Sequence, residues 1–201
     1  MKSGAPPLLP ILRSRHQADL LTWLFFHPGK EFTLTELADR IGASTSTVHN
    51  EAARLEQHGI VRWRNLGRAR LLQANLNSRI ADPLSQLLLL TFGPWLVVRE
   101  EFARLEGIEK LLIYGSWAAR YEGEPGPMPA DVDVLVVGGP DRAEVYAAAD
   151  RSEARLELPV NPTVRSLEQW ESRSDALVTS IKAAPSVDLD LRVDAPDAVL
   201  R

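Results

Sequence analysis

Two aspartates spaced one residue apart are the side chains of this sequence best suited to metal chemistry. Asp131 and Asp133 open an apolar run that ends at Val137, and such a run predicts a buried strand. Because side chains alternate across a strand, both carboxylates project from one face. Carboxylates placed together in this way can share a divalent cation. The spacing therefore indicates a Mg²⁺ site at the start of this strand.

A Gly-Ser pair upstream could bind phosphate beside that cation. Gly115 and Ser116 follow the apolar stretch 109–114, which predicts another buried strand, and they precede residues that predict a helix. Backbone N–H groups and a hydroxyl at such a turn suit the phosphates of a nucleotide. A Gly/Pro-rich loop, 123–129, then leads to the strand with the two aspartates. A cation held there would neutralise charge in an in-line phosphoryl transfer.

These motifs resemble the nucleotidyltransferase superfamily with the DNA-polymerase-β-like fold. They are most similar to its minimal nucleotidyltransferases, whose signature is Gly-Ser followed by Asp-x-Asp, and the resemblance spans about residues 108–192. It implies that Gly115 and Ser116 bind a nucleoside triphosphate. It also implies that Asp131 and Asp133 bind the metal and act in catalysis.

The position expected for the third acid of this family holds an amide instead. The family takes that carboxylate from the next strand of the sheet, which we predict at 155–164, after a helix at 142–152, and the corresponding residue is Asn161. An amide cannot act as a general base or supply the charge that holds a second metal. Glu157 shares the predicted face, but it lies about 13 Å away along an extended strand.

Two further acids lie near the C-terminus, in a strand predicted at 187–191. Asp188 and Asp190 alternate along it, so they either approach Asp131 and Asp133, here called the acid pair, or point to solvent. The sequence therefore predicts nucleotide binding and leaves open whether the chain is an enzyme.

Three short helices are predicted before residue 60. The first, 17–26, has apolar residues at helical intervals and stops at His-Pro-Gly. The second, 34–41, follows a Thr-x-x-Glu sequence with capping-box spacing. The third begins at Ser44 or Thr45 and ends at Gly59. Two arginine-rich strands joined by an Asn-Leu-Gly turn come next, which predicts a β-hairpin.

This arrangement resembles the winged helix-turn-helix repressors of the ArsR and MarR type. The resemblance covers about residues 14–76, with a Leu-Ala-x-x-Ile-Gly turn and a Gly-Ile-Val exit from the third helix. In that fold the third helix enters the major groove and the hairpin, or wing, lies along the backbone of double-stranded DNA. The DNA-binding residues this implies are Thr45, Ser46, Thr47, His49, Asn50 and Arg54 on the helix and Arg62, Arg64, Arg68 and Arg70 on the wing. A winged helix used for protein contacts is the alternative.

The charge distribution separates the two halves of the chain. Residues 1–80 hold 11 Lys and Arg against 6 Asp and Glu, whereas residues 81–201 hold 12 against 21. A basic module joined to an acidic one is typical of a nucleic-acid reader fused to a second function, and ordinary solvated surface charge is the alternative. The absence of cysteine excludes disulfides, cysteine-ligated metals and thiol catalysis.

We therefore predict an α+β protein with two domains. A winged helix-turn-helix domain, 1–80, precedes connecting helices, 81–106, and a nucleotidyltransferase-like domain, 107–201, built on a mixed β-sheet flanked by helices. The connecting helices could form a homodimer through the face with Leu84, Leu87, Leu88 and Thr91, or pack within the chain. The first residues do not resemble a signal peptide and no apolar run approaches the ~20 residues of a membrane span, so we expect a cytoplasmic protein.

Three functions fit these expectations. The first is a DNA-binding transcriptional regulator whose second domain binds a nucleotide as a sensor, with weak or no catalysis. The second is an active Mg²⁺-dependent nucleotidyltransferase that modifies a protein, an RNA or a small molecule. The third is an antitoxin-like module that acts with a toxin.

Overall fold

The chain divides into two compact units. The computed structural model describes residues 12–67, 69–172 and 174–191. The boundary between the units lies between Thr91 and Phe92. It falls within the segment 81–106 that we expected to connect two domains, so each unit takes part of that segment.

The first unit is a helical domain with a β-hairpin. In chain order its elements are α1 (Arg15–Phe26), α2 (Leu34–Ile41), α3 (Thr45–Gln57), β1 (Val61–Leu66), β2 (Ala69–Ala74) and α4 (Ala81–Phe92). The helix signals in the sequence are confirmed. Thr33 and Glu36 form the expected capping box before α2, Gly42 ends that helix in the left-handed region with φ of 62°, and Ser44 caps α3.

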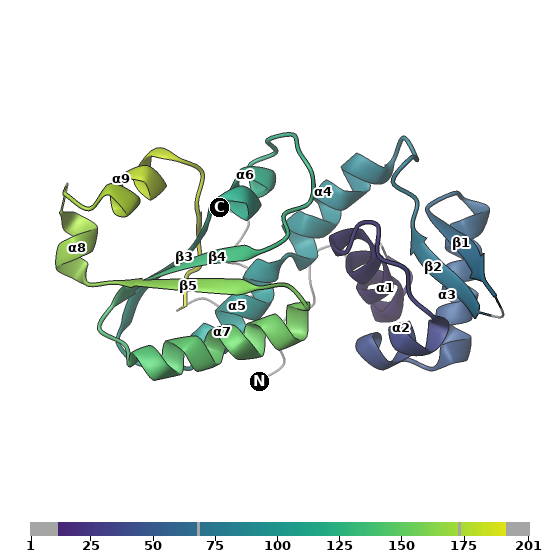
Figure 1. Cartoon of the computed structure of the whole chain (residues 1–201), viewed down its shortest axis with the longest axis horizontal. Helices are drawn as coiled ribbons and strands as arrows, with labels where there is room; N and C mark the ends of the chain where they lie inside the picture. The colour runs from purple at the N-terminus through teal and green to yellow at the C-terminus, as the bar shows by residue number, and fades with distance from the viewer. Residues whose placement is uncertain (1–11, 68, 173, 192–201) are drawn as a thin grey trace. The chain divides into compact units, whose positions relative to one another are not determined.

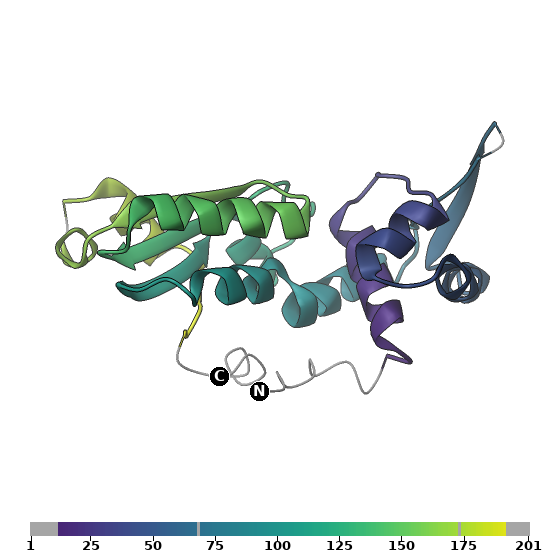
Figure 2. The ribbon, with the colours of Figure 1, turned by 90° about the horizontal axis from the view of Figure 1, so that it is seen from below.

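The predicted hairpin is also confirmed. β1 and β2 pair in antiparallel register, with Arg62 opposite Gln73 and Arg64 opposite Leu71. Phe32 forms a β-bridge with Leu72, which attaches the hairpin to the segment before α2. Figure 2 shows the hairpin extending away from α2 and α3. Side chains that are almost completely buried form the core of this unit, among them Leu20, Leu24, Phe25, Leu37, Val48 and Leu72.

The second unit is built around a mixed β-sheet (Figure 1). Its elements are α5 (Pro94–Phe102), β3 (Ile108–Tyr114), α6 (Ser116–Tyr121), β4 (Val132–Gly138), α7 (Arg142–Leu156), β5 (Val160–Arg165), α8 (Leu167–Glu171), α9 (Ala176–Ala183) and β6 (Val187–Asp188). In the described residues the strand order is β5-β4-β3-β6. β3 is antiparallel to both neighbours, whereas β4 and β5 are parallel and joined by α7.

Helices cover both faces of this sheet. Figures 1 and 2 show α5 and α7 together on one face, and Figure 1 shows α6, α8 and α9 on the other. On the second face Leu112, Leu135 and Val137 form a buried cluster with Ile181 of α9, and Trp170 of α8 packs against it. The fold is thus α+β, as predicted.

The segment after β4 differs from the prediction. α7 continues to Leu156 rather than ending at Ser152, and β5 begins at Val160 rather than at Arg155. Glu157 is the residue after the helix and adopts the left-handed region with φ of 49°. The prediction that Glu157 shares a strand face with Asn161 is therefore wrong, because the helix uses the residues that would have extended the strand.

The helices around the boundary are rich in apolar residues. Residues Ala81–Phe102 are long and apolar enough to cross a membrane by length and composition alone, and 44% of the apolar window is buried within the protein. Core helices of globular proteins pass the same test. Of the face predicted either to form a dimer or to pack within the chain, Leu88 and Thr91 are buried within the chain, while Leu87 is 44% exposed. The burial of Leu88 and Thr91 fits the second alternative.

A buried carboxylate joins α5 to α7. Glu101 is 4% exposed, and its two oxygens accept hydrogen bonds from Arg151 at 2.8 Å and Arg155 at 2.7 Å. The hydrogen bond from Arg151, with one from Arg155 and the charge of Arg104, holds the pKa of Glu101 below its ordinary value of 4.5 against the opposing effect of burial. A carboxyl with a lowered pKa stabilises the folded state at neutral pH and loses that effect as pH falls through its folded pKa.

We expect Glu101→Gln to lower the free energy of unfolding at pH 7 by about 1–2 kcal/mol, since both arginines are partly exposed. Chemical denaturation followed by circular dichroism would measure it, and the difference from the parent should shrink as pH falls below 4.5 and through the lowered folded pKa of Glu101. The control is Glu100→Gln, whose carboxylate is exposed and bonds only Arg155 among the described residues. Equal losses for the two variants would contradict the role given to Glu101.

Candidate functional sites

Three polar side chains meet at the start of the parallel strand pair. Asp131 directly precedes β4, Asp133 lies within it, and Asn161 of β5 is the register partner of Asp133. The Asn161 amide Nδ2 donates to Asp131 Oδ2 at 3.1 Å and to Asp133 Oδ1 at 3.4 Å. One amide group therefore bridges the two carboxylates.

The Gly-Ser turn lies against the same carboxylate. Gly115 has φ of 71°, and a Cβ at this position would lie 2.8 Å from Asp133 Oδ2. Both facts require glycine, because other residues disfavour this φ and a side chain would displace the carboxylate. Ser116, the next residue, is exposed and begins α6. The fold thus brings Gly115 and Ser116 to the acid pair, although the two motifs are separated by the 123–129 loop.

The site is negatively charged and partly shielded from water. Burial raises the pKa of Asp133, and the nearby charge of Asp131 raises it further, while the hydrogen bond from Asn161 acts in the opposite direction. The amide N–H groups offset part of the repulsion between the carboxylates. A divalent cation would do so more strongly.

The donor set fits one Mg²⁺. Two carboxylate oxygens converge on the point where the Asn161 nitrogen lies, and Mg²⁺ is commonly bound through one or two carboxylates, with water and substrate phosphates completing its shell. Rotation of the Asn161 amide would present its oxygen to the same point. The described residues contain no cluster of three or more acidic, histidine or cysteine ligands. The chain's own side chains therefore suit a single cation better than a pair.

Two neighbours of the site were not foreseen from the sequence. Tyr114 is the register partner of Asp133 on β3, and its hydroxyl reaches toward Thr163 of β5, with the oxygens 3.5 Å apart. Both side chains are half-buried. The sequence did hold a signal for Tyr114. It is the last strand residue before the Gly115-Ser116 turn, which was already expected to lie beside the acids.

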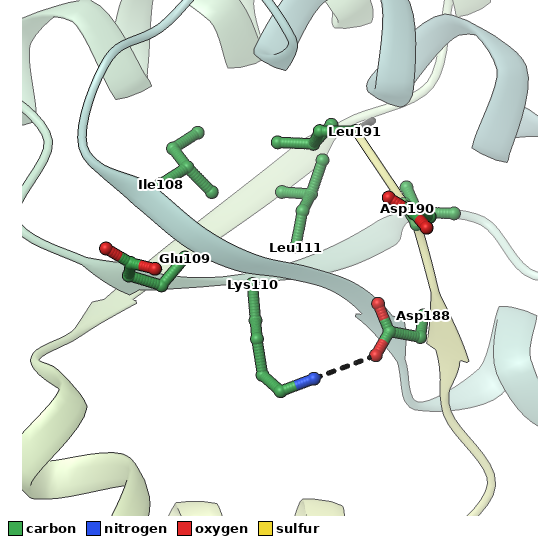
Figure 3. Close-up of a pocket in the computed structure, with 8 residues that line it drawn as sticks. Ile108, Glu109, Lys110, Leu111, Asp188, Asp190 and Leu191 are labelled. Atoms are coloured by element: carbon green, nitrogen blue, oxygen red, sulfur yellow. Dashed lines mark hydrogen bonds and ion pairs between the residues drawn. The ribbon is translucent and has the colours of Figure 1, made fainter. Parts of the chain in front are cut away.

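The late acids do not join the acid pair. Asp188 lies on β6, which β3 separates from β4, and two strand spacings are about 10 Å. Its carboxylate binds Lys110 Nζ at 3.0 Å (Figure 3). Asp188 and Asp190 line a separate hollow of about 300 Å³ at that edge of the sheet, together with Ile108, Glu109, Lys110, Leu111, Leu189 and Leu191.

The exposed face of α3 carries most of the predicted DNA-reading residues. Thr45, Ser46, His49 and Asn50 are exposed. Thr47 is half-buried, and its hydroxyl already has a partner within the protein. Its backbone N–H donates to the Ser44 hydroxyl, and the Thr47 hydroxyl lies 2.8 Å from the same Ser44 oxygen. Arg54 is exposed but pairs with Glu51 at 3.2 Å.

The wing arginines have different partners. Arg62 donates to Gln73 at 3.0 Å, while Arg64 donates through two nitrogens to the two oxygens of Glu31. The guanidinium of Arg70 lies 4.3 Å from the centre of the Trp63 ring and 3.6 Å from Glu56. Arg68 lies outside the described residues. Nothing in the sequence pattern indicated Glu31, which precedes its partner by 33 residues.

One protein-family model matches the first unit. Residues 19–65 match the IclR helix-turn-helix domain family. Similar solved structures are reduced HlyU from Vibrio cholerae, with a TM-score of 0.33 and 22% identity over 41% of this chain and 81% of HlyU, and Lactococcus lactis ZitR in complex with DNA, with a TM-score of 0.36 and 15% identity over 51% of this chain and 66% of ZitR. No curated protein sequence matches the chain.

The family match confirms the prediction of a helix-turn-helix DNA-binding domain. The chain carries a helix-turn-helix DNA-binding domain of the kind found in transcription regulators, and the matched type is IclR, whereas the motifs resemble the ArsR and MarR types.

Proposed function

We propose that this protein is a cytoplasmic transcriptional regulator that binds specific double-stranded DNA through α3 and the wing. The observation that carries the proposal is an IclR-type helix-turn-helix whose third helix exposes a row of short polar side chains. Residues of this kind read base edges in the major groove. The wing then contributes phosphate contacts that do not depend on sequence.

Asn50→Ala should change which DNA sequence the protein prefers. Asn pairs with adenine through two hydrogen bonds, and such a pair discriminates against the wrong base by about 1–3 kcal/mol, or roughly 5- to 150-fold at one position. Selection from a random duplex library, followed by sequencing, measures the preference. The control is Asn77→Ala, the same change at an exposed residue after the hairpin. An unchanged preference for Asn50→Ala would remove Asn50 from the reading face.

We also propose that the regulator is a homodimer. One winged helix offers little contact area for a tight operator complex, and a dimer reads two half-sites of a pseudo-palindrome. The first unit leaves three large apolar side chains exposed around the start of α4: Leu76 at 45%, Ile80 at 47% and Leu87 at 44%.

Light scattering should therefore give about twice the chain mass of 22.3 kDa at micromolar concentration. Ile80→Asp with Leu87→Asp should return the chain mass, because charge on this surface opposes its burial. The circular dichroism spectrum would show whether the variant is folded. A parent that elutes only as a monomer would contradict the proposal.

For the second unit we propose binding of a Mg²⁺-nucleoside triphosphate. The proposal is supported by the meeting of the Gly115-Ser116 turn with Asp133, and by two carboxylates directed at one point. Asp131 and Asp133 would hold the cation, while Gly115 and Ser116 would contact phosphate. The similarity to minimal nucleotidyltransferases rests on these residues and on the order of β3, α6, β4, α7 and β5.

We propose a sensor rather than an enzyme, because the residue beside the acid pair is Asn161. An amide neither accepts a proton from an attacking hydroxyl nor adds charge for a second cation. Incubation with each α-labelled nucleotide and with protein or RNA acceptors tests this directly. Little or no label should be transferred. Robust transfer that is lost on Asp131→Asn would establish a nucleotidyltransferase instead.

A further inference from the structure

We propose that Arg70 is the wing arginine that contacts the DNA backbone, and that Arg64 instead positions the hairpin through Glu31. This rests on the proposed DNA binding of the first unit. The sequence pattern gave both arginines the same DNA-binding role. The proposal instead makes Arg70 a binding residue and Arg64 a positioning residue.

Strand alternation separates the two side chains. Arg62 and Arg64 project from one face of the hairpin, together with their cross-strand partners Gln73 and Leu71. Trp63 lies between them in sequence and therefore projects from the other face. Arg70 shares that other face, since its guanidinium lies over the Trp63 ring. Arg64 and Arg70 thus point away from each other across the hairpin.

On the face with Arg64, the polar side chains already form hydrogen bonds with one another. Both Glu31 oxygens accept from Arg64, and Gln73, which is 6% exposed, donates to Glu31 Oε1 at 2.7 Å and accepts from Arg62. A bidentate carboxylate is the best-matched partner of a guanidinium, so a phosphate would have to displace it. Glu31 directly precedes Phe32, which bridges to Leu72. The pair therefore ties the hairpin to the segment before α2.

The face with Arg70 is directed toward α3. Its ion-pair partner, Glu56, belongs to α3 and lies two helical turns after His49, on the same side of that helix. The ion pair is longer than the one at Arg64. The two arginines are equally exposed, but Glu56 is 43% exposed whereas Glu31 is 20% exposed, so water competes more strongly for the partner of Arg70. The Trp63 ring holds the guanidinium in place without neutralising its charge. Arg70 is thus a preorganised cation at the border of the DNA-reading face.

The test compares the full-length parent with Arg70→Gln, Arg64→Gln and Glu31→Gln. Fluorescence anisotropy on a random-sequence duplex of about 30 base pairs, at salt between about 50 and 300 mM, gives the slope of log affinity against log salt. Thermal unfolding of each free variant gives its stability. The duplex is the same in every measurement, so a change of slope reports phosphate contacts alone.

We expect Arg70→Gln to reduce the slope by about one unit and to leave the melting temperature close to that of the parent. Arg64→Gln and Glu31→Gln should keep the parent slope and share a lower melting temperature, because each breaks the same pair. A slope reduced by Arg64→Gln as much as or more than by Arg70→Gln would overturn the inference. If the parent itself shows no salt-dependent binding, the proposed DNA-binding function fails first.

Discussion

Replacing Asp131 and Asp133 together with asparagine is expected to abolish Mg²⁺-dependent binding of nucleoside triphosphate. The amide keeps the shape of each side chain but removes the charge that a hard cation requires. The fold should survive, because both acids lie at the edge of the core and neither is fully buried. Isothermal titration with ATP, GTP, CTP and UTP in the presence of Mg²⁺ measures the loss.

The matched control for this variant is Glu144→Gln with Asp150→Asn, which removes two exposed carboxylates from α7. It should bind nucleotide as the parent does, so that the effect cannot be assigned to net charge. Omitting Mg²⁺ should reproduce the loss with the parent protein. Nucleotide binding that persists in the double variant would exclude the acid pair as the cation site.

Asn161→Asp is expected to make the second unit dependent on Mg²⁺ for its stability. The Asn161 amide now donates to both neighbouring aspartates, and a carboxylate there would replace attraction by repulsion among three acids. In EDTA the melting temperature should fall by several degrees, and Mg²⁺ should restore it, because a third carboxylate strengthens the cation site. The same change could raise nucleotidyl transfer, since a carboxylate can accept the proton of an acceptor hydroxyl.

The control for this prediction is Asn77→Asp, which adds one negative charge at an exposed residue of the other unit. Its melting temperature should be insensitive to Mg²⁺. An Asn161→Asp variant that melts like the parent with and without Mg²⁺ would show that the three side chains are not coupled.

Local signals in the sequence were reliable where the structure depends on local chemistry. The Thr33 and Glu36 capping box and the left-handed Gly42 define α2 because each is satisfied within a few residues. The turn at Gly115 also depends on one backbone conformation. Asn161 could be aligned with the acids because the family resemblance places a third carboxylate on the next strand, and the structure pairs Asn161 with Asp133.

Longer-range features could not be predicted in the same way. The start of β5 depends on where α7 ends, and Glu157 closes that helix in a conformation that non-glycine residues seldom adopt. The pairing of Arg64 with Glu31 joins the hairpin to a segment 33 residues earlier. Nothing in the spacing of charges encodes such a contact, since it depends on the folded arrangement of the strands and the Phe32 bridge.

A DNA-binding regulator whose second unit responds to a nucleotide must bind DNA with an affinity that depends on that nucleotide. The affinity of the full chain for its selected duplex should be determined with Mg²⁺ alone and with each nucleoside triphosphate at saturation. Because binding linkage is reciprocal, a nucleotide that acts as an effector must change DNA affinity by the factor by which DNA changes its own affinity, typically about 5-fold or more. We predict such a change for at least one nucleotide, and its loss in the Asp131→Asn, Asp133→Asn variant. Tight, specific DNA binding that is identical with all four nucleotides would contradict regulation of DNA binding by a nucleotide.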